Sequence, residues 1–100
     1  MAPQLTDRRA FVEQRLFDVQ LEIERARNEV EFVEHQLAGV EGSATAAVAR
    51  LTLAETPVAA RACSTARGRL AQMRAAAQLA QQRLGTLESA RDDLLAKLLG

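Results

Sequence analysis

Large aromatic side chains are nearly absent from this sequence. Among its 100 residues there is no tryptophan and no tyrosine, and the phenylalanines are Phe11, Phe17 and Phe32. A chain with so few rings lacks the side chains that usually fill a thick globular core. Apolar residues still make up 48% of the chain, and alanine is the commonest of them. This composition favours thin seams between helices whose backbones approach closely.

Cysteine and histidine each occur once, as Cys63 and His35. One cysteine forms neither a disulfide framework nor a thiolate cluster, which is typical of a protein from a reducing compartment. His35 has no second histidine or cysteine at ligand spacing, and the chain contains no glycine-rich phosphate loop or nucleophile elbow. We therefore expect no metal, no cofactor and no enzymatic activity, with Cys63 as a small packing residue.

Long apolar runs are also missing. No stretch approaches the roughly 20 residues that a membrane-spanning helix needs, and the N-terminus lacks the pattern of a signal peptide. The C-terminal segment is amphipathic but has few basic residues, which argues against binding to a membrane surface. These features predict a cytoplasmic protein.

Glycine and proline, which punctuate helices, number only five and two. Strong helix formers dominate the rest of the chain. A chain of this length suffices for one small domain. We therefore predict one all-α domain over residues 1–100.

The clearest pattern is a heptad seam in the first half of the chain. Its apolar residues alternate at spacings of four and three, which is the signature of a helix packed lengthwise against another helix. Gly39 and Gly42 follow it, and a glycine just past the last seam residue fits a helix C-cap. The seam consists of Val12, Leu16, Val19, Ile23, Ala26, Val30, Val33, Leu37 and Val40.

The glycines predict an antiparallel helical hairpin, or coiled coil, of two unequal arms. The first helix is expected over about 7–38, the turn over 39–42 and a long helical arm over about 44–99. Thr56-Pro57 predicts a kink or short break in that arm, because proline removes a helical hydrogen bond. Thr56 as N-cap with Pro57 at the first helical position is also a standard helix start.

The seam of the second arm is predicted at Val58, Ala62, Ala66, Leu70 and Met73. Its first spacings are four, four and four, which indicates a stutter in the heptad pattern. An alternative is a three-helix bundle with a break near Gly68 or Gly85, in which the C-terminal tail folds back on the first helix.

Unequal arms leave the segment from Gln78 to Leu99 with nothing opposite it, although it is rich in leucine. Full burial of one leucine is worth about 1.5–3 kcal/mol, so a partner is expected to cover these side chains. The first helix carries apolar residues outside its seam as well. The predicted contact residues are Phe11, Phe17, Leu21, Phe32, Leu84, Leu87, Leu94, Leu95 and Leu98.

Charge is balanced overall, with 13 bases and 13 acids, but it is unevenly spread. Between Pro57 and Leu84 there are arginines and no acid, so an acidic first helix is expected beside a basic second one. The predicted function is a non-enzymatic interaction, scaffold or adaptor module that self-associates or binds another helical protein. One alternative is a regulatory hairpin that docks on a polymerase, secretion or division complex through Glu41 at its tip. Another is nucleic-acid binding by the arginine-rich arm, against which zero net charge and the absence of aromatics there argue.

Overall fold

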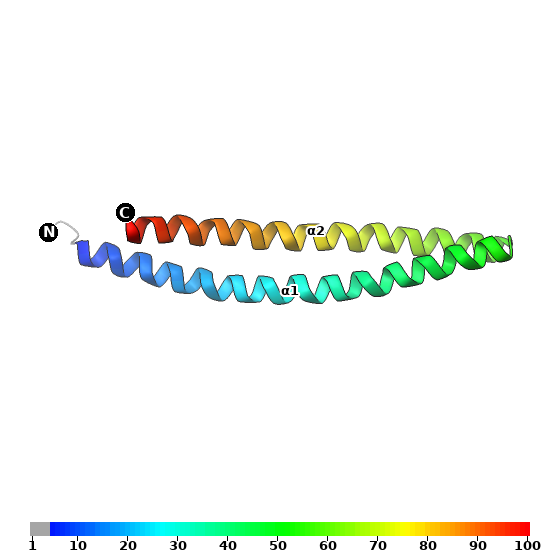
Figure 1. Ribbon diagram of the computed structural model, residues 1–100, viewed down its shortest axis with the longest axis horizontal. Coiled ribbons are helices and arrows are strands. Elements are labelled where there is room, and N and C mark those ends of the chain that lie inside the picture. Colours follow the sequence, from blue (N-terminus) through cyan, green and yellow to red (C-terminus); the bar gives the residue numbers. More distant parts are fainter. Residues whose placement is uncertain (1–4) are drawn as a thin grey trace.

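The computed structural model describes residues 5–100, with side chains from Asp7 onward, and in this range the chain is all-helical. Helix α1 spans Leu5–Leu53 and helix α2 spans Pro57–Leu99. The two helices lie side by side in opposite directions, so both ends of the described chain lie at one end of a rod of 78 × 18 × 17 Å (Figure 1). The predicted all-α helical hairpin is confirmed.

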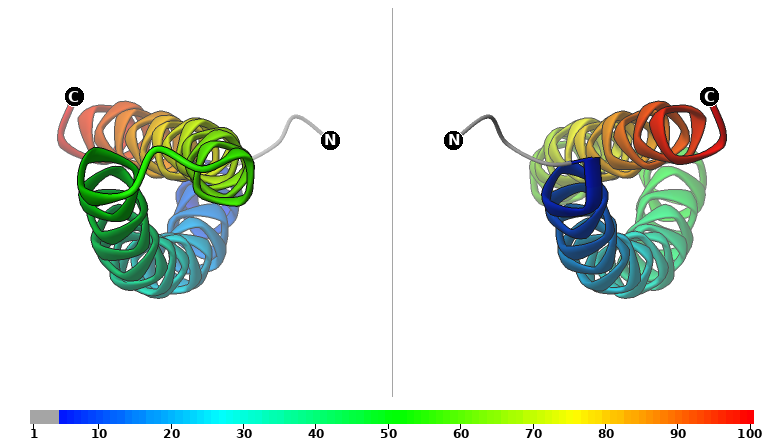
Figure 2. Two further views of the ribbon diagram at one scale, coloured as in Figure 1. Left: turned by 90° about the vertical axis from the view of Figure 1, so that its right-hand side faces the viewer. Right: turned by 90° about the vertical axis from the view of Figure 1, so that its left-hand side faces the viewer.

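The two helices wind past each other along the rod. Viewed end-on, α1 sweeps through an arc while α2 is straighter (Figure 2). Such winding keeps a seven-residue apolar repeat facing its partner helix.

The reversal is not at Gly39–Gly42, as the sequence analysis expected, because α1 continues through both glycines. Each glycine costs about 1 kcal/mol relative to alanine inside a helix. That cost is offset because the seam itself continues past the glycines, with Ala44 and Ala47 both buried. Within this part of α1, the Ser43 hydroxyl donates a hydrogen bond to the Gly39 carbonyl oxygen at 3.2 Å.

The chain reverses over Ala54–Thr56. Thr56 is the N-cap of α2, in extended conformation, and its Oγ1 accepts a hydrogen bond from the Ala59 N–H at 3.1 Å. Pro57 is the first helical residue, where its missing N–H costs nothing. The Thr56-Pro57 pair therefore starts the second helix of the hairpin, and the arm kinked at this point is not observed.

Helix α2 is continuous through Gly68 and Gly85, so the three-helix alternative is also wrong. The two helices contain 49 and 43 residues and are nearly equal in length. The leucine-rich segment of α2 therefore lies beside the first half of α1 and does not form an unpaired overhang.

The seams of the two helices are related by a simple rule of position. Each seam residue of α1 precedes Glu55 by as many residues as its counterpart on α2 follows it: Leu16 and Leu94, or Ile23 and Leu87, are examples. All residues of the two seams follow this rule, whereas a few half-buried residues beside the seams, such as Asp18, Ala46 and Glu88, do not. The α2 seam is an unbroken heptad pattern, consisting of Ala59, Cys63, Ala66, Leu70, Met73, Ala77, Ala80, Leu84, Leu87, Arg91, Leu94 and Leu98.

Candidate interaction surface

The interior of the hairpin is a narrow strip of seam residues. Val19, Ile23 and Ala26 are buried, and Ile23 is 0% exposed. The other α1 residues predicted for this seam are half-buried: Val12, Leu16, Val30, Val33, Leu37 and Val40. Sequence reasoning missed Ala44 and Ala47, although continuing the same spacing past the glycines finds both.

On α2, the prediction is wrong at the start of the helix. Val58 is 68% exposed and Ala62 is exposed, whereas Cys63 is 3% exposed. The seam begins one residue later than predicted, at Ala59, and the expected stutter does not exist. Ala66, Leu70 and Met73 are half-buried, in the same phase as the rest of α2.

The leucines predicted to meet a partner are mostly used within the hairpin. Leu84, Leu87, Leu94 and Leu98 are half-buried, and only Leu95, at 37%, counts as exposed. The proposed overhang was wrong because the chain reverses later than the glycines suggested. Since α1 already covers these four leucines, they are not an unpartnered surface.

Polar side chains beside the seam connect α1 to residues 81–88 of α2. The Arg83 guanidinium donates to both oxygens of the Glu29 carboxylate, at 2.9 and 3.1 Å. Gln81 donates to Glu34 at 2.7 Å, and Arg27 lies 3.8 Å from Glu88. The expected pairing of an acidic α1 with a basic α2 side chain is present at Glu29–Arg83, whereas Arg27–Glu88 has the opposite polarity.

The phenylalanines lie outside the seam. Phe11 is 72% exposed, Phe17 and Phe32 are each 61% exposed, and Leu21 is 39% exposed. Phe17 and Leu21 are four residues apart and therefore neighbours on one side of α1. We call these four residues the aromatic face.

One residue of the aromatic face, Phe17, lines a shallow groove between the two helices. The groove has a volume of about 430 Å³. The groove extends from Phe17 of α1 to the exposed Leu95 of α2. Its lining residues are Glu13, Leu16, Phe17 and Gln20 from α1, and Arg91 and Leu95 from α2.

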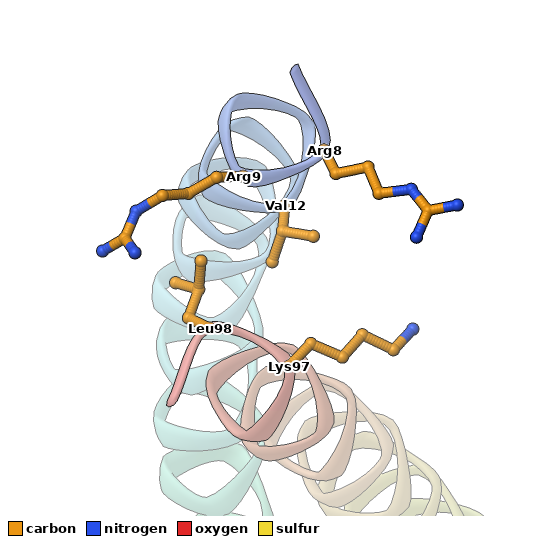
Figure 3. Close-up of a pocket in the computed structure, with 5 residues that line it drawn as sticks. All are labelled: Arg8, Arg9, Val12, Lys97 and Leu98. Atoms are coloured by element: carbon orange, nitrogen blue, oxygen red, sulfur yellow. The ribbon is translucent and has the colours of Figure 1, made fainter. Parts of the chain in front are cut away.

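A second hollow lies at the end of the rod where both helix termini meet (Figure 3). Val12 and Leu98 lie between the helices there, while Arg8 and Lys97 extend to one side and Arg9 to the other. Arg9 is paired with Glu13 at 3.0 Å. These cations extend into solvent and leave the apolar floor of the hollow uncovered.

Charge is unevenly distributed along the rod. The distal segment, which we define as residues 42–74 around the reversal, has five arginines and one acid, Glu55, for a net charge of +4. The described remainder, residues 5–41 and 75–100, has eight bases and twelve acids, for a net charge of −4. Arginines are therefore concentrated next to the reversal, whereas the two equal halves of the rod, residues 30–80 and the described remainder, have net charges of only +1 and −1.

Arginines of the distal segment have few acidic neighbours. Glu41 lies within α1 and lines one hollow with Arg67 and Arg74, so it is not at the tip as predicted. Among residues 7–100, no ion pair within 4.0 Å involves Arg61, Arg67, Arg69 or Arg74. Their charges are thus accessible on the surface of the distal segment.

Residues capable of chemistry are not assembled into a site. Cys63 is buried in the seam, and His35 is exposed on α1. Over the described part of the chain, no three His, Cys, Asp or Glu side chains are grouped so as to hold a metal ion. Neither described helix has a stretch long and apolar enough to cross a membrane.

Comparison with known proteins provides no relative. No protein-family model, curated protein or solved structure matches this chain.

Proposed function

We propose that this protein is a non-enzymatic interaction module, a coiled-coil hairpin that self-associates through the outer side of α1. The observation that supports the proposal is the aromatic face. Its phenylalanines remain 61–72% exposed, whereas the leucines in the seam positions of both helices are half-buried. The same face offers a helical surface on which another protein can dock.

The free energy gained by burying these phenylalanines is large enough to drive association. Covering one phenylalanine side chain is worth about 1.5–3 kcal/mol, so covering all of them supplies several kcal/mol toward association. A helix that is apolar on two sides is typical of one with two neighbours. Helix α2 is one neighbour, and a second helix is the natural occupant of the other side.

Sedimentation equilibrium at micromolar concentration tests the proposal. The wild-type protein is expected to be a dimer or larger, and Phe17→Glu/Phe32→Glu is expected to be a monomer. Both side chains are exposed within the hairpin, so these changes leave its seam intact. The matched control is Val58→Glu/Leu79→Glu, which changes two α2 residues that are 68% and 58% exposed.

The control variant is expected to associate like the wild type. A monomeric wild-type protein at these concentrations contradicts self-association. If the control variant loses self-association to the same extent, the assignment of the contact to α1 is contradicted.

A second candidate is nucleic-acid binding by the distal segment, residues 42–74, supported by its net charge of +4. Phosphate contacts by arginines weaken steeply as salt rises. Filter binding with DNA and RNA over a salt series tests this candidate, with Arg67→Ala/Arg74→Ala expected to retain less of either. Retention that is absent, or that does not change with salt, rules it out.

A further inference from the structure

The end of the rod at which the chain reverses has exposed aliphatic side chains. Leu53, the last residue of α1, is 88% exposed, and Val58, the second residue of α2, is 68% exposed. The residues between them, 54–57, are exposed as well. This end lies opposite the helix termini and is remote from most of the aromatic face (Figures 1 and 2). We call residues 53–58 the tip.

Several backbone donors of the tip are already satisfied within the chain. The Ala54 N–H donates to the Arg50 carbonyl oxygen at 2.9 Å, and the Thr56 N–H donates to the Ala54 carbonyl oxygen at 2.8 Å. The Thr56 hydroxyl accepts from the Ala59 N–H, and Pro57 has no N–H to satisfy. Unpaired backbone donors are costly away from water. The connector is therefore suited to surroundings with less water than bulk solution.

Arginines follow the tip on both helices. With a rise of 1.5 Å per residue, Arg50 and Arg61 lie about 8–9 Å from Glu55 along the rod, and Arg67 and Arg69 lie about 18–21 Å from it. All four arginines are exposed, and none forms an ion pair within 4.0 Å with a described residue. Apart from Glu55, the nearest acid is about 21 Å back along α1. Positive charge thus predominates close to the tip.

The arginines of α2 project in different directions around the helix. At about 100° per residue, Arg67 is rotated by about 120° from Arg61 in one sense, and Arg69 by about 80° in the other. A nucleic-acid duplex or a partner helix that lies along the rod meets only one of these directions. A negatively charged plane across the end of the rod attracts all of them.

We propose that the tip binds end-on to the surface of a bilayer that contains anionic phospholipids. Leu53 and Val58 enter the interface between the headgroups and the acyl chains. Arg50 and Arg61 contact lipid phosphates, because attraction to anionic lipids acts within a Debye length of about 8–10 Å. The arginines farther back contribute less. This site does not depend on self-association, and the base-poor C-terminal segment lies at the other end of the rod.

Co-sedimentation with lipid vesicles tests the binding. The wild-type protein is expected to sediment with vesicles of equal parts phosphatidylcholine and phosphatidylserine, and to stay in solution with phosphatidylcholine alone. Leu53→Ser/Val58→Ser is expected to lower the affinity for the anionic vesicles at least tenfold. Both side chains are exposed, so the variant should keep its helix content, which far-UV circular dichroism checks.

The matched control is Leu79→Ser/Leu99→Ser, which removes two leucines that are 58% and 88% exposed away from the tip. This control is expected to bind vesicles like the wild type. Equal loss in both variants, or no loss in either, overturns insertion of the tip. A wild-type protein that does not sediment with the anionic vesicles overturns the proposal and leaves another protein as the occupant of the tip.

Glu55 provides a test of opposite sign. Its carboxylate is the one charge within the tip, and an anionic surface repels it. Glu55→Gln is therefore expected to strengthen binding to the anionic vesicles about fivefold. Glu31→Gln, which removes an exposed acid of α1 far from the tip, is expected to have no such effect. Equal effects of the two variants indicate a response to net charge alone and overturn docking through the tip.

Fluorescent labels test the direction of binding. Cys63→Ala removes the native thiol, and Leu53→Cys or Leu79→Cys then carries a fluorophore that brightens in apolar surroundings. Leu79 lies about 36 Å from the tip along the rod. On the anionic vesicles, the label at position 53 is expected to brighten and the label at position 79 to remain unchanged. Equal brightening at both positions shows a rod that lies flat on the membrane and overturns the end-on arrangement.

Duplex DNA separates this site from nucleic-acid binding by the distal segment. Leu53→Ser/Val58→Ser leaves every arginine in place, so any retention of DNA is expected to be unchanged while vesicle binding falls. A protein that retains DNA but does not bind anionic vesicles supports the second candidate function and overturns the membrane-binding tip.

Discussion

At the scale of single residues, position relative to the seam decides what an apolar side chain contributes. Ile23 is 0% exposed and Val58 is 68% exposed. Both are branched aliphatic residues inside long helices, so helix propensity does not separate them. The seam does, because only Ile23 is removed from water by the opposite helix.

Ile23→Ala is therefore expected to lower the free energy of unfolding by about 2–4 kcal/mol, through lost burial and the cavity left behind. Urea denaturation followed by far-UV circular dichroism, at one protein concentration throughout, measures this loss. Val58→Ala serves as the control and is expected to stay within about 0.5 kcal/mol of wild type. Similar losses at both positions contradict the seam described here.

Arg91 is the one charged residue in a seam position. Its side chain is 26% exposed, and its Nε donates to Asp92 at 3.2 Å. A polar residue at a single seam position fixes the register of a coiled coil at some cost in stability. Arg91 therefore limits sliding of α2 along α1, in a region where leucines on either side fit more than one register.

At the scale of elements, the short connector determines where the second helix starts. The Thr56 hydroxyl satisfies the Ala59 N–H, one of the backbone groups that have no partner within a helix. Thr56→Ala is expected to lower the free energy of unfolding by about 1 kcal/mol. Thr56→Ser retains the acceptor oxygen and should remain close to wild type in the same denaturation experiment, whereas equal losses in both variants contradict the cap.

Ion pairs between the helices contribute less to stability. The Glu29 and Arg83 side chains are 45% and 55% exposed, and exposed pairs of this kind are worth about 0.2–1 kcal/mol. Their main effect is on alignment, because they join residues far apart in the sequence at one level of the rod.

The sequence alone predicts the helical hairpin, because the spacing from Val12 to Val40 leaves little choice of structure. It misplaced the reversal because Gly39 and Gly42 were given more weight than the seam that continues through them. The local preference of glycine was overridden by burial of Ala44 and Ala47. Alanine seams are hard to recognise in a chain that is rich in alanine throughout.

That single error also changed the predicted contact surface. With the reversal at the glycines, Leu84 and Leu98 were left without a neighbour. With it at Ala54–Thr56, both lie against α1. The phenylalanines lie outside the seam wherever the chain reverses. Their angular position around α1, relative to Val12 and Leu16, depends only on their spacing within that helix.

At the scale of the whole molecule, self-association through the outer side of α1 predicts the dimensions of the dimer. Two hairpins packed side by side along α1 should be thicker than one hairpin and little longer than its 78 Å. Small-angle X-ray scattering measures the maximum dimension directly. A value approaching twice the hairpin length indicates end-to-end association and contradicts the side-by-side pair.

The connector also disfavours domain swapping, in which two copies would exchange their α2 helices. If α1 and α2 merged into one straight helix, the seam ending at Leu51 would continue through residue 58, whereas the seam of α2 starts at Ala59. The spacings of three and four are also out of step, so the pair 59/63 of the α2 stripe comes five residues after the pair 54/58 of the continued α1 stripe, which rotates the second stripe by about 140° around the helix. In an extended chain the two apolar stripes therefore lie on different sides of one helix. A second extended chain cannot cover both stripes along a single seam, so the repeat pattern favours the closed hairpin over a domain-swapped dimer.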